Sequence, residues 1–113
     1  MNQRDKLIVK YAEDLKLRFD EEADLELLKK ITIGLGPSIY NRDSATISSS
    51  EESEFERVKT QFLERKLKLD PIETDLDSPL TNILEKYGRT HRTKYRAVVY
   101  YLLVKYYRKE EVY

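Results

Sequence analysis

The chain has 113 residues, the size of one ordinary domain, and we expect residues 1–113 to form a single helical domain. Its 21 Lys and Arg residues balance 21 Asp and Glu residues, so the formal net charge is zero. Cysteine is absent, which excludes disulfides, thiolate zinc sites and thiol catalysis. These totals exclude several chemistries and point to no activity.

The charges are unevenly distributed along the chain. Residues 1–56 carry eight basic and thirteen acidic side chains, whereas residues 85–113 carry eight basic and three acidic ones. The simplest explanation is that the two ends attract each other and help the fold to close. A net positive end could also face an anionic partner, because charge distribution bears on partners more than on folds.

Neither a signal peptide nor a membrane span is expected. Lys10 interrupts the apolar run Leu7-Ile8-Val9, so the amino terminus lacks the apolar region of a signal peptide. The longest apolar run, Ala97–Val104, has eight residues, against the roughly twenty that a span needs. We therefore expect a cytoplasmic protein without a membrane partner.

Apolar residues at helical spacing predict a first helix over residues 2–18 and a second over residues 25–35. The buried face of the first is expected at Leu7, Ile8, Tyr11 and Leu15, with Asp14 on the solvated side. That of the second is expected at Leu25, Leu28, Ile31 and Leu35. Asp24 is placed to cap the second helix, and Gly34 or Gly36 to end it.

An irregular stretch, Pro37–Ser50, precedes a third predicted helix over residues 51–69. Ser49 and Glu52 have the spacing of a capping box, which predicts the start of this helix. Its inner face is expected at Phe55, Val58, Phe62 and Leu69. Asp70-Pro71 should end it, because a residue before proline avoids helical geometry.

Two more helices are predicted in the last third of the chain. Ser78-Pro79 has the pattern of a cap followed by a first helical residue, and Gly88 should close this fourth helix. The last helix should start near Thr90 or Thr93 and run to about residue 109, with its main stripe at Tyr95, Val98, Val99, Leu102 and Tyr106. Because Ala97–Val104 is apolar on every side, we expect its neighbours to enclose it. The predicted fold is all-α: a compact five-helix single domain with a buried C-terminal helix.

Several segments together resemble a known family. Ile31–Asn41 and Lys94–Lys105, with Arg4–Ile8 and the closing Val112-Tyr113, resemble small bacterial proteins grouped as a domain of unknown function, DUF2853. The resemblance spans nearly the whole chain and departs most over residues 70–82. It implies a bacterial, cytosolic, single-domain protein, and it supplies neither an activity nor site residues.

No constellation of residues favours catalysis. The only histidine, His91, lies in a basic run without an adjacent carboxylate, and one histidine without cysteine cannot build a zinc site. Gly34-Leu35-Gly36 lacks the third glycine of a dinucleotide-binding loop. We therefore expect no catalytic residue, cofactor, metal or small-molecule substrate.

One basic cluster favours a sharper hypothesis, and it consists of Arg89, Arg92, Lys94 and Arg96. It follows a predicted helix and a glycine turn and begins the next helix, which is the outline of a helix-turn-helix. Such side chains could contact the phosphates of a nucleic acid. Alternatively, they solvate the start of a buried helix and pair with the acidic half of the chain.

Tyrosine is the other unusual feature, with nine in the chain. Tyr100, Leu103 and Tyr107 lie together on one face of the last predicted helix. Tyrosine is common at interface hot spots because it combines apolar area with a polar tip. Alternatively, these tyrosines belong to a core helix and only their hydroxyls reach the surface. The main functional hypothesis is a non-enzymatic protein-interaction or self-association module that uses this face or the Pro37–Ser50 segment. Nucleic-acid binding by the basic cluster is the alternative.

Overall fold

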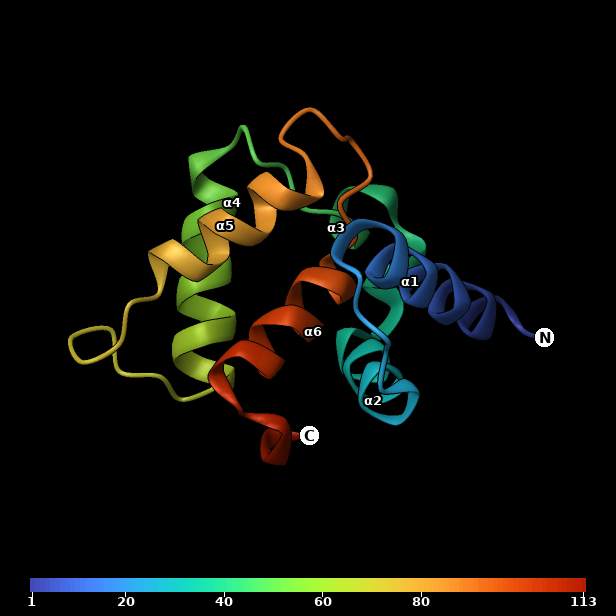
Figure 1. The fold of residues 1–113 in the computed structure, drawn as a ribbon, viewed down its shortest axis with the longest axis horizontal. Coiled ribbons are helices and arrows are strands. Elements are labelled where there is room, and N and C mark those ends of the chain that lie inside the picture. Colours follow the sequence, from blue (N-terminus) through green and yellow to red (C-terminus); the bar gives the residue numbers. More distant parts are fainter.

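The computed structural model describes residues 1–113 and consists of helices, with no β-strand (Figure 1). The long helices are α1 (Gln3–Phe19), α2 (Leu25–Leu35), α5 (Asp77–Tyr87), α6 (Arg96–Tyr107) and the continuous rod of α4 (Glu52–Arg57) and the π-helical segment η2 (Val58–Lys66). The short ones are η1 (Gly36–Tyr40), α3 (Arg42–Ala45) and η3 (Glu110–Val112). The all-α prediction is confirmed, but the count of five helices missed α3, a sixth α-helix. None of the helices combines the length and apolar composition needed to cross a membrane.

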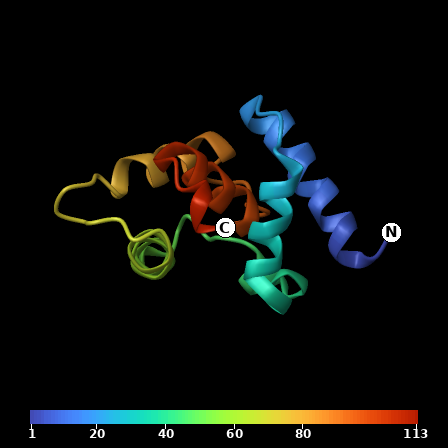
Figure 2. The same ribbon diagram turned by 90° about the horizontal axis from the view of Figure 1, so that it is seen from below.

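Helix α6 occupies the centre of the fold. In Figures 1 and 2 it lies between the pair α1 and α2 on one side and α5 with the α4–η2 rod on the other. Its buried residues are Arg96, Ala97, Val98, Val99, Tyr100, Tyr101, Leu103 and Val104. This confirms the expectation that neighbours enclose the last helix. Removing apolar surface from water at this helix is the main force that holds the layers together.

Capping side chains and glycines mark where several helices begin and end. Asn2 Oδ1 accepts from the Asp5 N–H at 2.8 Å at the start of α1, and Asp24 Oδ1 accepts from the Leu27 N–H at 3.2 Å at the start of α2. Gly36 and Gly88 end α2 and α5 with φ of 66° and 112°, a region that favours glycine. These short-range interactions explain why the starts of α1 and α2 and the ends of α2 and α5 follow from the sequence.

Two predicted caps are wrong. Ser49 does not cap α4, because its hydroxyl donates instead to the Arg89 carbonyl at 2.9 Å. Ser78 does not cap α5 either, because Asp75 Oδ1 accepts from the N–H groups of Asp77 and Ser78, both at 3.1 Å. These bonds also lower the pKa of Asp75, since they favour its charged form.

The third helix differs from its prediction in winding and length. The wider turns of η2 place Val58, Phe62 and Leu63 inside the molecule, and Leu67 just beyond it is buried as well. Phe55 and Leu69, two expected core residues, are only half-buried. The helical segment ends at Lys66, and Lys68 then adopts a left-handed φ of 61°, so the chain has already turned before Asp70-Pro71.

The burial of three helical residues differs from what the periodicity predicted. Leu25 and Tyr106 are exposed, although both were placed on buried stripes. Asp14 is buried, although it was placed on the solvated side, because it accepts a hydrogen bond from the Tyr87 hydroxyl at 2.6 Å. A distant partner of this kind reverses the preference of a carboxylate for water.

The enclosure of α6 predicts a difference between two neighbouring leucines. Leu103 is fully buried and Leu102 only half-buried, so Leu103→Ala should lower the free energy of unfolding by about 2–5 kcal/mol. Leu102→Ala should cost clearly less, because less of its side chain leaves a cavity. Urea denaturation of both variants measures the difference. An equal loss of unfolding free energy in both variants would mean that Leu103 does not lie in the core.

Candidate functional site

The basic cluster is divided between the interior and the surface. Lys94 is only 2% exposed, and its Nζ donates to the carbonyl oxygens of Gly88 at 3.2 Å, Arg89 at 3.3 Å and His91. It thereby closes the loop that follows α5. Burial lowers the pKa of Lys94, because the charged form loses water. The prediction that Lys94 contacts nucleic acid is wrong, since its ammonium group faces the protein's own backbone.

Arg96 is also buried and serves the fold. Its guanidinium forms an ion pair with Glu54 and donates to the carbonyls of Ser44 at 2.9 Å and Thr46 at 3.3 Å. It also donates to the Tyr100 hydroxyl at 3.3 Å. All of these acceptors are inside the chain, so the prediction that Arg96 contacts nucleic acid is wrong. The planar guanidinium suits this role because it can donate to several groups at once.

The last helix begins at Arg96, later than the predicted start near Thr90 or Thr93, because the residues before it form contacts with the segment before α4. Residues 88–95 form a loop instead of a first helical turn, and the Ile47 N–H donates to the Lys94 carbonyl at 2.8 Å. An isolated antiparallel bridge pairs Thr46 with Tyr95 beside it. These contacts tie the end of the loop to the segment before α4, and the Ser49 hydroxyl, which donates to the Arg89 carbonyl, ties its beginning. This arrangement is not the helix-turn-helix that the sequence suggested, because α6 begins only at Arg96.

Arg89 and Arg92 remain at the surface, where they line a polar pocket of about 370 Å³. The opposite wall is the serine run Ser48–Ser50, and the carboxylates of Asp43 and Glu51 line the same space. Arg89 also forms an ion pair with Glu85 at 3.3 Å. The polar pocket therefore presents both charge signs and is not a uniformly cationic surface for phosphates.

His91 lies at the edge of this pocket. Burial is the main cause that lowers its pKa, the charges of Arg18 and Lys94 lower the pKa further, and the carboxylate of Asp14 raises it in part. The ring centroid of His91 lies 5.6 Å from that of Tyr87.

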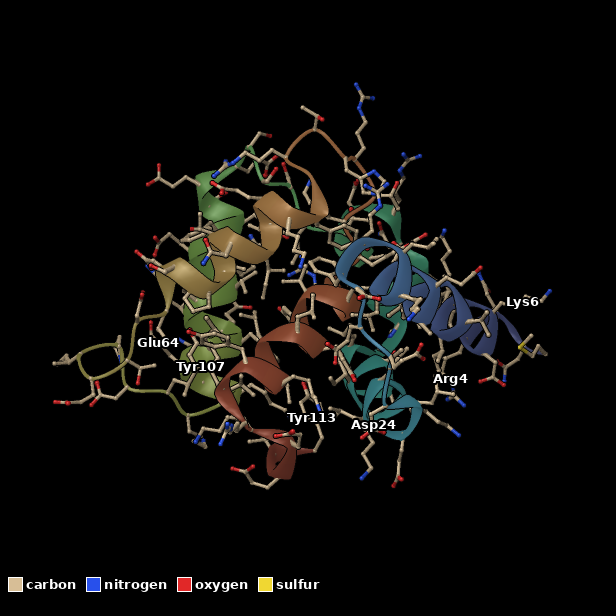
Figure 3. The ribbon with its side chains drawn as sticks, viewed as in Figure 1. Arg4, Lys6, Asp24, Glu64, Tyr107 and Tyr113 are labelled. Atoms are coloured by element: carbon tan, nitrogen blue, oxygen red, sulfur yellow. The ribbon has the colours of Figure 1, made fainter.

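The predicted tyrosine face is largely buried. Tyr100 stacks on Phe62 of η2 with ring centroids 3.7 Å apart, and Leu103 beside it is fully buried. Tyr107 lies on the η2 side of α6 in Figure 3, and its hydroxyl donates to the Asp75 carbonyl at 2.6 Å. Burial raises the pKa of Tyr107 to about 12. The prediction of an exposed interface is wrong at Tyr100 and Leu103, because both are buried, and Tyr107 is only half-exposed with its hydroxyl bound to the connector before α5.

The Pro37–Ser50 segment is also tied to the fold. Ile39, Ala45 and Ile47 are buried, and Arg96 binds two of the segment's carbonyls. A loop fixed in this way resembles a structural brace more than a free binding loop.

The structure shows a different apolar surface that the sequence pattern did not predict. The α1–α2 groove is an open hollow of about 600 Å³ on the outer side of the two helices. It is lined by Met1, Asp5, Ile8, Val9, Ala12, Glu13, Lys16, Leu25 and Lys29. Val9 is 46% exposed and Leu25 59% exposed. The available signal was Val9, an apolar residue outside the predicted stripe of the first helix.

The buried ion pair predicts a large cost for removing one charge. Glu54→Gln keeps the shape of the side chain but leaves the Arg96 charge buried without a counter-ion, so it should destabilise the fold by about 3–5 kcal/mol. Glu56→Gln is the matched control, because Glu56 is an exposed carboxylate that pairs with Lys59 at 3.4 Å. Its cost should stay below about 1 kcal/mol. Thermal and urea unfolding compare the two, and similar costs would contradict the role of Glu54 as the counter-ion.

Comparison with known proteins supports the resemblance noted in the sequence. A search of the curated proteins finds no match. A family model described as a protein of unknown function, DUF2853, matches residues 10–111. Because the match covers most of the helical fold, the chain belongs to the DUF2853 family.

Proposed function

We propose that the protein is a non-enzymatic protein-interaction module of the bacterial cytoplasm and that its contact surface is the α1–α2 groove. The observation that carries the proposal is the exposure of Met1, Val9 and Leu25 around this one hollow. Apolar side chains gathered at one place mark contact sites more often than scattered ones do. Covering them would be favourable by about 25 cal/mol for each Å² of apolar area removed from water.

The groove is preformed, which supports its use in binding. The inner faces of the two helices are fixed by burial of Ile8 and Leu15 on α1 and of Leu28 and Ile31 on α2. A hydrogen bond also joins α6 to the start of α2, because the Tyr101 hydroxyl accepts from the Asp24 N–H at 2.8 Å. A rigid surface loses little conformational entropy when a partner binds, so more of the apolar contact contributes to affinity.

The proposal treats the protein as non-enzymatic because of the environment of His91. Its imidazole makes no hydrogen bond to a carboxylate, although the Asp14 charge opposes the effect of Arg18 and Lys94 on its pKa, and a tyrosine ring packs beside it. A general base works best when a carboxylate orients it and its pKa lies near the working pH.

The nucleic-acid alternative has less support from the geometry. Only Arg89 and Arg92 of the four proposed contacts are exposed, and carboxylates share their pocket. Backbone binding to a nucleic acid gains affinity from several cations that each neutralise a phosphate. We therefore do not propose this function.

Capture on immobilised protein tests the role of the groove. Wild-type protein and the control variant Ile72→Asp, which changes an exposed apolar residue on the connector before α5, should retain the same proteins from a bacterial lysate. Leu25→Asp places a charge in the groove and should lose them, because a desolvated carboxylate opposes apolar contact. Circular dichroism checks that each variant is folded. Equal retention by all three proteins would contradict the proposal, and so would no retention by any of them combined with a wild-type protein that does not self-associate.

A further inference from the structure

We propose that the partner of the α1–α2 groove is a second copy of this chain, bound about a twofold axis that crosses the groove. The inference rests on the proposed function, and it adds the identity and orientation of the partner. Two observed features carry it: the apolar lining of the groove, and two charges on its rim that have no partner within the chain. A twofold axis would pair these charges between the two copies.

The rim of the groove carries one acidic and one basic group that lack partners in the chain. Glu13 lies on α1 and Lys29 on α2, so the two charges belong to different helices of the same groove. Both are exposed, and neither takes part in an ion pair within the chain. The neighbouring Lys16 differs, because its ammonium already binds Glu22 at 3.0 Å and Asp20 at 3.4 Å.

Twofold symmetry makes this rim complementary to itself. In such an interface, a contact between residue i of one copy and residue j of the other occurs twice. A second copy that lies across the groove with its helices exchanged places its Lys29 opposite Glu13 and its Glu13 opposite Lys29. Two ion pairs then flank the apolar contact between the Val9 and Leu25 side chains. An apolar centre with a polar rim is the usual anatomy of a homodimer interface.

The same charges disfavour a lipid surface as the occupant. Asp5 and Glu13 line the groove beside its lysines, and carboxylates repel the anionic headgroups that attract amphipathic helices. A helix from an unrelated protein would need its own matching charges, whereas a second copy has them by symmetry.

Sedimentation equilibrium over a concentration series tests the proposal. The wild-type protein should show a reversible monomer–dimer equilibrium. Glu13→Lys or Lys29→Glu alone should weaken dimerisation by about tenfold, because each change replaces two attractive pairs by two repulsive ones. The double variant with both substitutions should recover the wild-type dissociation constant, since the pairs are restored with exchanged signs.

The control for these variants is Lys6→Glu, which reverses a charge on an exposed position of α1 outside the groove lining (Figure 3). It should leave the dissociation constant within about twofold of wild type, because a charge away from the contact is largely screened by salt. Leu25→Asp should abolish the dimer while the helical circular dichroism spectrum stays unchanged.

Three results would overturn the inference: a wild-type monomer at every concentration, a dimer that Leu25→Asp leaves intact, or a double variant as weak as the single ones. Its failure can be separated from failure of the proposed function. If the wild type is monomeric but still captures proteins that Leu25→Asp loses, the groove binds a different protein and only this inference is wrong. If neither dimer nor groove-dependent capture is found, both are wrong.

Discussion

The structure depends on burying a helix whose first residue is an arginine. Helix α6 is enclosed from Arg96 to Tyr101, and the charge at its start requires compensation wherever water is excluded. Glu54 supplies the counter-charge, and the carbonyls of Ser44 and Thr46 supply further acceptors. These groups lie about half a chain earlier in the sequence, so this contact fixes α3 and α4 against the central helix. The ion pair that allows α6 to be buried therefore also positions the α4–η2 rod.

This constraint also decides what the basic segment does. Lys94 and Arg96 are cations whose donors all point at groups of the same chain, and they join the loop after α5 to the segment before α4. In the sequence these residues have the pattern of a phosphate-binding surface. In the fold their donors are satisfied by carbonyl oxygens of the chain, which offsets the cost of burying two charges. The proposed contact surface is instead the hollow that residues of α1 and α2 line.

Periodicity and local caps predicted the helices well, because both depend on residues within a few positions of each other. Asp24, Gly36 and Gly88 mark helix ends as expected, and the unbroken apolar run of α6 correctly indicated enclosure. The candidate sites were predicted poorly, because exposure is a tertiary property. Tyr100 and Leu103 have the spacing of a surface patch, but both are buried, and Phe62 of the π-helical segment η2 stacks on Tyr100. Ser49 satisfies a cap pattern and yet donates to Arg89, a partner 40 positions away. The α1–α2 groove could not be predicted because it arises from the angle between two helices.

The central claim is that α6 is the enclosed core on which the other helices pack, and native-state hydrogen exchange tests it most directly. The amides of Val98 to Val104 should be among the slowest in the protein and should exchange only through global unfolding, with a free energy equal to that from urea denaturation. Helix α3 and the outer turns of α1 should exchange faster, through local opening. Exchange of the α6 amides as fast as those of α3 would contradict the claim, because a helix that opens so readily cannot be the core.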